Sequence, residues 1–310
     1  MNNIARLKYY LGDILNNKLC IIDNYTIFTD TNINHAEIIK INKNILRNSN
    51  IKGSYKEILY FLDEIYDDKP FLFACGDIKI NIDVPAFVKN RNSLLCKSII
   101  FKSMNSKRHW NKDNFNLAIN DKNKKILKCL WRGVTTGKPD IKYNNKLYFQ
   151  REILVEQYFN KNEELIDVGF NKLCQGKIEC KKYLKEFISI EDQLKYKFLL
   201  SIEGNDIATD LKWKLLSKSV VLMRKPTKFS WLMEDKLIPD YHYILLKDDF
   251  SDLEEKLEWA INNLEKVDEI IKNANKYMEM FLDEKNEEHL QKKIIKIYFN
   301  NVKFISSKNS

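Results

Sequence analysis

The chain has 310 residues, of which 44% are hydrophobic, 12% aromatic and 31% charged. This composition excludes a disordered or fibrous protein and is typical of a globular one with room for two compact domains. No run approaches the roughly 20 consecutive apolar residues that span a bilayer, and the first residues lack the apolar core of a signal peptide. We therefore expect a cytoplasmic protein.

The formal net charge is +9, and the lysines are spread along the whole chain. Such a charge fits an anionic membrane face, a phosphorylated acceptor, a nucleotide diphosphate or nucleic acid, and equally a genome whose codons favour lysine. The six cysteines form no CxxC pair and the four histidines are scattered. We therefore predict reduced thiols and no metal site.

The first third of the chain carries two helical patterns and one strand pattern. Apolar spacing predicts an amphipathic helix over residues 4–15 and a second helix over 58–65, with Ser54 as its cap. The run FLFAC at 71–75 predicts a buried strand, which is followed by Gly76 and Asp77. Because ligands gather at the carboxyl ends of strands in open α/β sheets, Asp77 is a candidate functional residue.

The rest of the chain alternates between strand and helix patterns. Strands are expected at 126–131, 164–168, 196–202, 219–223 and 242–246, and helices at about 147–159, 189–195, 207–217 and from 251 onward. A polar loop is expected from Arg132 to residue 140. The alternation predicts a parallel sheet with right-handed crossovers. We expect an N-terminal domain at 1–125, a second domain at 126–280 and a helical tail at 281–310 that packs back.

Residues 197–222 predict a strand, a glycine-containing turn and a helix in direct succession. The N-terminus of such a helix suits a diphosphate, and Gly204 would let a ligand approach the backbone. Glu203 would then accept hydrogen bonds from ribose or sugar hydroxyls, and Asp206 could cap the helix. On pattern alone, a plain β–α turn is the more common explanation.

Several ordered motifs resemble one protein family. EGND at 203–206, ATDLKWKLLSKSVVL after it and the tract at 223–259 are similar to bacterial members of glycosyltransferase family 90, which contains the CAP10 domain. LWRG at 130–133, SKRHW at 106–110 and PAFVKNR at 85–91 follow the order of that family. The resemblance spans roughly residues 71–260, and an ordered set is more specific than any single motif.

The resemblance implies an α/β protein of GT-B type, in which two Rossmann-like domains face a cleft. It implies an inverting transferase that moves a hexose from a UDP-sugar to a lipopolysaccharide or lipooligosaccharide core, or a related glycan, without a metal or other cofactor. The expected partners are the UDP-sugar and a lipid-linked oligosaccharide, and not nucleic acid. Peripheral contact with an anionic membrane, at the inner face of the inner membrane, is a further option.

An inverting transferase needs one carboxylate to remove the proton of the acceptor hydroxyl. The base that the resemblance implies is an Asp that directly follows a strand, which Asp77 matches best. Asp83, which precedes Val84 and Pro85, is the alternative. Arg108 and His109 are expected on the acceptor side, although a structural histidine is the more common role for His109.

The donor site that follows from the turn and the resemblance includes arginines for the phosphates and polar groups for the sugar. Its predicted members are Arg132, Thr135, Arg151, Glu203, Gly204, Asn205, Asp206, Lys212 and Glu234. The sequence departs from eukaryotic members at Asp210, where they carry an arginine, so either Lys212 or backbone N–H groups would neutralise the diphosphate. Trp231 faces the donor or belongs to the core.

The alternative function is a catalytically idle nucleotide-binding or nucleic-acid-binding protein. The basic charge and the aromatic content favour it, but the sequence has no RNP-like, helix-turn-helix or zinc-finger signature.

Overall fold

A computed structural model describes residues 1–23, 38–50, 56, 58–65, 68–74, 81–102, 110–143 and 146–306. The chain divides into two compact units. Unit 1 comprises Met1–Asn111, Thr227–Glu234 and Met280–Ser310, and unit 2 comprises Lys112–Pro226 and Asp235–Glu279. Unit 1 therefore contains both ends of the chain and one short segment from its middle.

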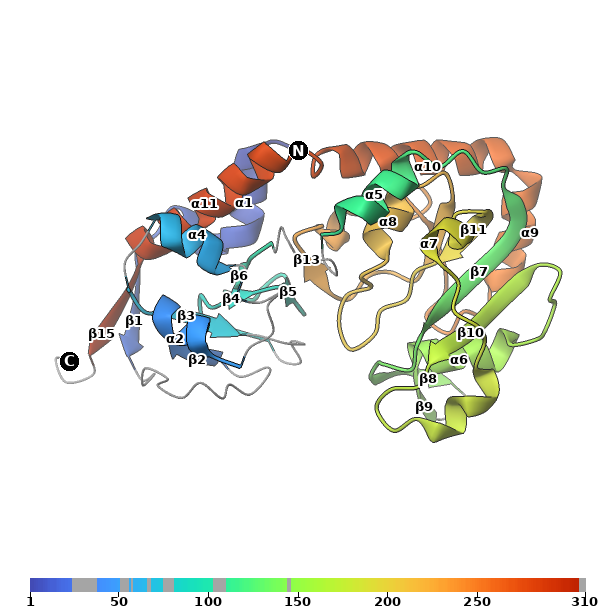
Figure 1. The fold of residues 1–310 in the computed structure, drawn as a ribbon, viewed down its shortest axis with the longest axis horizontal. Helices are drawn as coiled ribbons and strands as arrows, with labels where there is room; N and C mark the ends of the chain where they lie inside the picture. Colours follow the sequence, from blue (N-terminus) through green and yellow to red (C-terminus); the bar gives the residue numbers. More distant parts are fainter. Residues whose placement is uncertain are drawn as a thin grey trace. The chain divides into compact units, whose positions relative to one another are not determined.

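Two helices from opposite ends of the chain pack together in unit 1. Helix α1 (Asn3–Leu11) begins where the Asn2 side chain accepts a hydrogen bond from the N–H of Ala5. It lies beside α11 (Glu284–Asn301), as Figure 1 shows. Just beyond them, β1 (Leu19–Asp23) and β15 (Val302–Ser306) pair in parallel. The C-terminal helix thus packs onto the N-terminal helix within unit 1. Strand β15 was not predicted.

The main sheet of unit 1 has the strand order β2-β3-β4-β6. Its strands are β2 (Ile38–Ile41), β3 (Phe71–Ala74), β4 (Phe87–Val88) and β6 (Ile99–Ile100), and helices α2 (Lys43–Asn48) and α4 (Ile58–Ile65) belong to the same unit. Strand β5 (Asn90–Arg91) pairs with β13 (Phe229–Ser230), which fixes the middle segment to unit 1. The predicted strand at 71–75 and helix at 58–65 are confirmed in their described residues.

A buried charge cluster joins the elements of unit 1. The carboxylate of Glu287 on α11 accepts hydrogen bonds from Arg6 on α1 and from Lys102, which follows β6. The Lys102 ammonium also lies 3.5 Å from the ring centroid of Trp110 and 4.2 Å from that of Trp231. Trp231 is 2% exposed and is therefore a core residue of unit 1.

Unit 2 is built on an open sheet of five parallel strands in the order β10-β7-β11-β12-β14. The strands are β7 (Ile126–Val134), β10 (Ile166–Lys172), β11 (Tyr196–Leu200), β12 (Val220–Met223) and β14 (Ile244–Leu245) (Figure 1). Of these five strands β7 comes first in the chain, and it lies between β10, the second, and β11, the third. The strand order therefore reverses between β7 and β11.

Helices and one hairpin complete unit 2. The helices are α5 (Lys112–Ile119), α6 (Gln150–Tyr158), α7 (Ile190–Gln193), α8 (Leu211–Leu216), α9 (Leu253–Asn262) and α10 (Leu264–Glu279). The core gathers large apolar side chains from strands and helices, among them Trp131, Phe170, Phe198, Leu222 and Leu257. The mixed α/β class and the parallel sheet are confirmed.

Three local predictions are corrected by the structure. Arg132 and Gly133 belong to β7, which extends to Val134, instead of beginning a loop. The expected helix start near 147 is occupied by the hairpin of β8 (Pro139–Tyr143) and β9 (Lys146–Phe149). Helix α8 begins only at Leu211, so Asp206 does not cap it, and the chain from Gly204 to Asp210 separates the glycine turn from the helix N-terminus.

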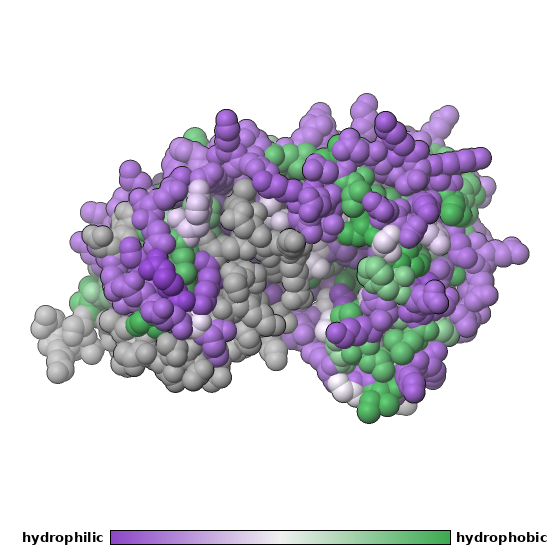
Figure 2. Space-filling model, in the orientation of Figure 1, coloured by the Kyte–Doolittle hydropathy of each residue, from purple (hydrophilic) through white to green (hydrophobic). Residues whose placement is uncertain are grey.

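The surface fits the composition. The face shown in Figure 2 is mostly hydrophilic, with hydrophobic residues in small patches. Within the described ranges, no helix combines the length and the apolar character needed to cross a bilayer. The described cysteines, Cys20, Cys96, Cys129, Cys174 and Cys180, are unpaired with one another.

Candidate functional site

The loops that follow β7 and β11 meet at the carboxyl edge of the sheet in unit 2. In open α/β sheets this edge, at the point where the strand order reverses, is where ligands bind. Arg151 on α6 spans the two loops. Its Nη1 donates to the Val134 carbonyl and to Thr136 Oγ1, and its Nη2 donates to the Ile202 carbonyl, each at 2.9 Å. The side chain therefore fixes the position of both loops.

Gly204 is tightly packed against this arginine. A Cβ at residue 204 would lie 3.0 Å from Arg151 Nη2, 3.0 Å from Thr136 Oγ1 and 3.2 Å from Arg151 Cζ. The glycine is thus explained by the close approach of a guanidinium and a hydroxyl, which is a reason that the sequence pattern did not supply.

A third loop, after β10, closes the same edge. Thr135 Oγ1 donates to the Cys174 carbonyl at 2.8 Å, and it accepts from the Cys174 N–H at 2.7 Å. Gln175 accepts from the Gly137 N–H at 3.3 Å, and its amide donates to Asn205 Oδ1 at 3.0 Å. Thr135 and Asn205, both predicted site residues, therefore hold together the loops at this edge of the sheet, and we call this loop-lined edge the crevice.

Arg224 directly follows β12 and lies among carboxylates. Its Nη2 donates to Asp140 Oδ2 at 3.1 Å and lies 3.8 Å from Glu203 Oε2, and its Nη1 lies 3.9 Å from Asp248 Oδ1. The two longer contacts are ion pairs without hydrogen bonds. The buried Nε has no hydrogen-bond partner among the described residues. The guanidinium therefore has donors to spare for an anionic or hydroxyl-bearing ligand.

Sequence reasoning missed Arg224 and Asp140. A signal for Arg224 was available, because it comes directly after the predicted strand at 219–223, in the same kind of position that made Asp77 a candidate. Asp140 carried no such signal, since it lies on β8, in a hairpin that was not expected. It also accepts from Gln150 at 3.0 Å, which links the hairpin to α6.

Asp210, which stands where eukaryotic family members carry an arginine, is neutralised by a lysine one turn further along α8. The Asp210 carboxylate forms an ion pair with Lys214 and accepts a 2.9 Å hydrogen bond from Ser201 Oγ. Lys214 also donates to the Leu200 carbonyl at the end of β11. Lys212 is 1% exposed and Asp206 is 5% exposed, so both belong to the interior of unit 2. Their predicted contact with a donor stays a prediction.

Arg132 lies on β7 with its guanidinium directed at the neighbouring strand. It forms two 2.9 Å hydrogen bonds to the carboxylate of Asp167 on β10, which also pairs with Lys185 at 2.8 Å. Burial alone would raise the pKa of Asp167, but the hydrogen bonds from Lys185 and Arg132 outweigh it and lower that pKa. Arg132 is thus part of an ion-pair network, and its contact with a phosphate stays a prediction.

The remaining predicted site residues belong to unit 1 or lie outside the described residues. Glu234 is 3% exposed and accepts hydrogen bonds from the N–H and the hydroxyl of Ser230. Asp83 is exposed and precedes β4. Asp77, Arg108 and His109 fall outside the described ranges.

One group of described side chains has the spacing of metal ligands, Glu152, Glu179 and Cys180. The Lys177 ammonium lies 2.7 Å from Glu152 and 3.6 Å from Glu179, so a cation already pairs with both carboxylates. Burial, with the Glu152 charge second, raises the pKa of the Cys180 thiol to about 12. A protonated thiol is a poor metal ligand, and the group is better explained as an ion pair.

Comparison with known proteins agrees with the motif order. A sequence model of glycosyl transferase family 90 matches residues 108–308, more than half of the chain. The chain is 32% identical over 239 residues to the O-glucosyltransferase LpsA of Dichelobacter nodosus, covering 75% of this chain and 67% of that protein. It is 29% identical over 149 residues to Protein O-glucosyltransferase 2 of Danio rerio, covering 47% of this chain but only 27% of that protein.

These matches define a glycosyltransferase. The chain belongs to glycosyltransferase family 90, as the motifs predicted. The family match continues through α10 and α11, beyond residue 260, at about which the motif resemblance ended.

Proposed function

We propose that this chain transfers a hexose from a UDP-sugar to a glycan acceptor, with inversion at the anomeric carbon, and that unit 2 binds the donor. The observation that carries the proposal is the convergence of Arg151, Glu203, Gly204 and Arg224 at the reversal point of a parallel sheet, in a chain of family 90. A nucleotide diphosphate is the kind of ligand that such an edge accommodates.

The polar groups of the crevice suit different parts of the donor. Arg224 would donate to the diphosphate oxygens, where a guanidinium forms charge-assisted hydrogen bonds. Glu203, whose side chain is 10% exposed, would accept from ribose or sugar hydroxyls, because a carboxylate repels phosphate. Arg151 would act mainly by holding the two loops, since three of its hydrogen bonds go to them.

The chemistry needs one base and a stabilised leaving group. A carboxylate removes the proton of the acceptor hydroxyl while its oxygen forms a bond to the anomeric carbon. The bond from that carbon to the diphosphate oxygen breaks, and its electron pair leaves with UDP, where Arg224 stabilises the charge. Asp77 is the proposed base and Asp83 the alternative. This assignment supposes a GT-B arrangement with unit 1 on the acceptor side.

The motifs that are similar to bacterial members of family 90 support the choice of acceptor class, and the name O-glucosyltransferase of the Dichelobacter relative supports glucose as the sugar. We propose a lipopolysaccharide or lipooligosaccharide core, or a related lipid-linked oligosaccharide, as acceptor, glucose or galactose as the sugar, and no metal requirement. The net charge of +9 is compatible with peripheral contact at an anionic cytoplasmic membrane face.

The test combines binding and turnover on the purified protein. We expect calorimetry to detect UDP binding, and UDP to be released from UDP-glucose or UDP-galactose only when deacylated lipooligosaccharide core is added. Proton NMR of the product should show the inverted anomeric configuration. UDP binding without any release would favour the idle nucleotide-binding protein, and absence of both would reject the transferase.

A further inference from the structure

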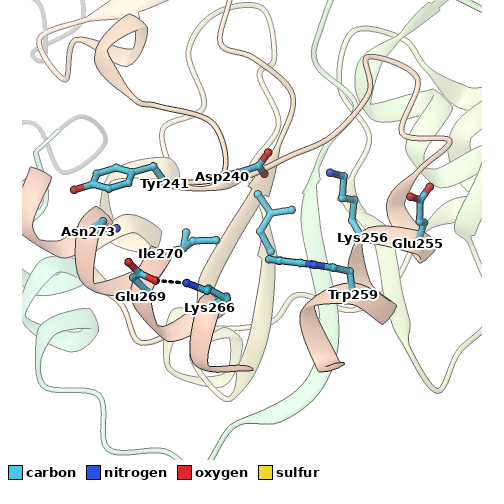
Figure 3. Close-up of a pocket in the computed structure, with 10 residues that line it drawn as sticks. Asp240, Tyr241, Glu255, Lys256, Trp259, Lys266, Glu269, Ile270 and Asn273 are labelled. Atoms are coloured by element: carbon cyan, nitrogen blue, oxygen red, sulfur yellow. Dashed lines mark hydrogen bonds and ion pairs between the residues drawn. The ribbon is translucent and has the colours of Figure 1, made fainter. Parts of the chain in front are cut away.

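A second concave site lies in unit 2, next to the edge strand β14. It is a pocket of about 480 Å³ formed by the loop before β14 and by helices α9 and α10 (Figure 3). None of the crevice residues Arg151, Glu203, Gly204 and Arg224 lines it. Its volume falls within the range of pockets that bind small molecules.

Two exposed aromatic side chains from different elements face this pocket. Tyr241, in the loop, is 48% exposed and Trp259, on α9, is 41% exposed. Figure 3 shows Ile270 between them. Ile270 and Ile244, both buried, are apolar residues of the pocket lining. Large aromatic groups that remain partly in water while bordering one cavity are typical of a surface that binds a ligand.

The loop that carries Tyr241 is held rigidly. Asp240 adopts a left-handed backbone with φ of 55°, its N–H donates to the Tyr243 carbonyl, and its carboxylate accepts from the Leu245 N–H at 3.1 Å. His242 Nδ1 accepts from the Ile238 N–H at 2.8 Å, and the His242 ring packs edge-on against Tyr241 at 4.8 Å. The aromatic wall is therefore preformed, which lowers the entropic cost of binding.

The rim of the pocket offers hydrogen-bond donors and acceptors in nearly balanced charge. Its polar residues are Asp240, Glu255, Lys256, Lys266, Glu269 and Asn273. Lys266 and Glu269 form an ion pair at 3.2 Å, as the dashed line in Figure 3 shows. Charges of both signs on the rim favour a neutral polar ligand that both donates and accepts hydrogen bonds, and they disfavour a long alkyl chain.

A sugar ring matches these features. Its C–H face packs on aromatic and aliphatic side chains, and its hydroxyls both donate to carboxylates and accept from ammonium and amide groups. We propose that this pocket binds a neutral saccharide unit, so that unit 2 holds a glycan at a site separate from the crevice. The proposal goes beyond sugar transfer and holds whether or not the crevice is catalytic.

The experiment measures saccharide binding directly, by calorimetry and saturation-transfer NMR, with maltotriose, cellotriose and lactose as probes. We expect saturable binding of at least one probe, weakened about tenfold or more by Trp259→Ala and by Tyr241→Ala. Phe187→Ala is the matched control, because Phe187 is 73% exposed and lies outside the pocket, and it should bind like the wild type.

Saturating UDP should leave the saccharide affinity unchanged, which separates this pocket from the crevice. Circular dichroism and the melting temperature verify that each variant is folded. The proposal is overturned if no probe binds saturably to the wild type, if both folded variants bind as tightly as the wild type, or if UDP displaces the saccharide.

Discussion

The guanidinium of Arg151 packs against the bare Cα of Gly204, so closely that a Cβ there would lie 3.0 Å from Nη2. This contact joins α6 to the loop after β11, while two hydrogen bonds of Arg151 reach Val134, the last residue of β7, and Thr136 in the loop that follows. The glycine and the arginine together thus set the distance between the loops after β7 and β11. A comparison of the single and double substitutions of Gly204 and Arg151 therefore tests whether the two residues act together.

Gly204→Ala should displace the guanidinium by a few tenths of an ångström and disturb the crevice more than the fold. We expect a loss of UDP affinity of about tenfold and a loss of unfolding free energy of about 1 kcal/mol. Calorimetry and urea unfolding measure the two. The double variant with Arg151→Ala should lose less than the sum of the single losses, because both substitutions disrupt the same contact. Additive losses would show that the two residues act independently.

Arg151→Lys should lower the melting temperature and the UDP affinity as Arg151→Ala does, instead of preserving them. A lysine keeps the charge but cannot reach three acceptors on two loops with one planar group. Hydrogen bonds from a charged donor contribute about 1.5 to 3 kcal/mol each, so both variants should lower the melting temperature as well as UDP affinity. If Arg151→Lys behaves like the wild type, then charge alone matters, and Arg151 would be a phosphate contact instead of a bridge between loops.

The sequence predicted the parallel sheet well because strand runs such as 196–202 and 219–223 are predominantly apolar. The structure shows the same strands within a few residues. The sequence could not predict which polar side chains contact each other in the folded protein. The contact of Arg151 with Ile202 joins residues 51 positions apart, and it depends on the order of strands in the sheet. Local patterns carry no information about that order.

Arg224→Ala tests the proposed phosphate contact. We expect UDP affinity to fall by about tenfold or more, since one charge-assisted hydrogen bond is lost and the carboxylates of Asp140 and Glu203 remain. Arg47→Ala is the control, because Arg47 is a half-exposed arginine of unit 1 whose only ion pair is with Asp63 among the described residues. An unchanged UDP affinity in Arg224→Ala would remove this residue from the donor site.

The position of α8 shows where local rules misled. The turn EGND followed by a helical pattern suggested a helix that begins at residue 207 and is capped by Asp206. The structure begins the helix at Leu211 and uses Asp210 to bind Ser201 and Lys214. Tertiary contacts with the end of β11 thus override the capping preference of Asp206. Binding of the diphosphate, first expected at the N-terminus of this helix, is therefore proposed for side chains such as Arg224.

Lys102 should make the stability of the protein depend on pH. Burial lowers the pKa of Lys102 from 10.5 to about 7, although Glu287 opposes the shift. Between these two pH values the unfolded chain binds more protons than the folded one, so the unfolding free energy contributed by this group rises with pH. The difference between wild type and Lys102→Met, measured by urea unfolding, should therefore grow in favour of the wild type from about pH 7 to about pH 9.

Lys8→Met is the control for that measurement, because Lys8 is an exposed residue of α1. Its difference from the wild type should stay constant over the same range. A constant difference for Lys102→Met as well would show that Lys102 keeps its proton in the folded protein throughout.

The choice between Asp77 and Asp83 as base can be made with two matched substitutions. The true base should lose transfer when changed to asparagine, by a factor of about 100 to 10,000, while UDP affinity stays nearly unchanged, because the amide keeps the shape but cannot accept the proton. We expect this result for Asp77→Asn and near-normal turnover for Asp83→Asn, measured as UDP release with saturating acceptor. The reverse pattern would move the base to Asp83, which is exposed to solvent just before β4. If both variants remain active, neither carboxylate is the base, and another group must remove the acceptor proton.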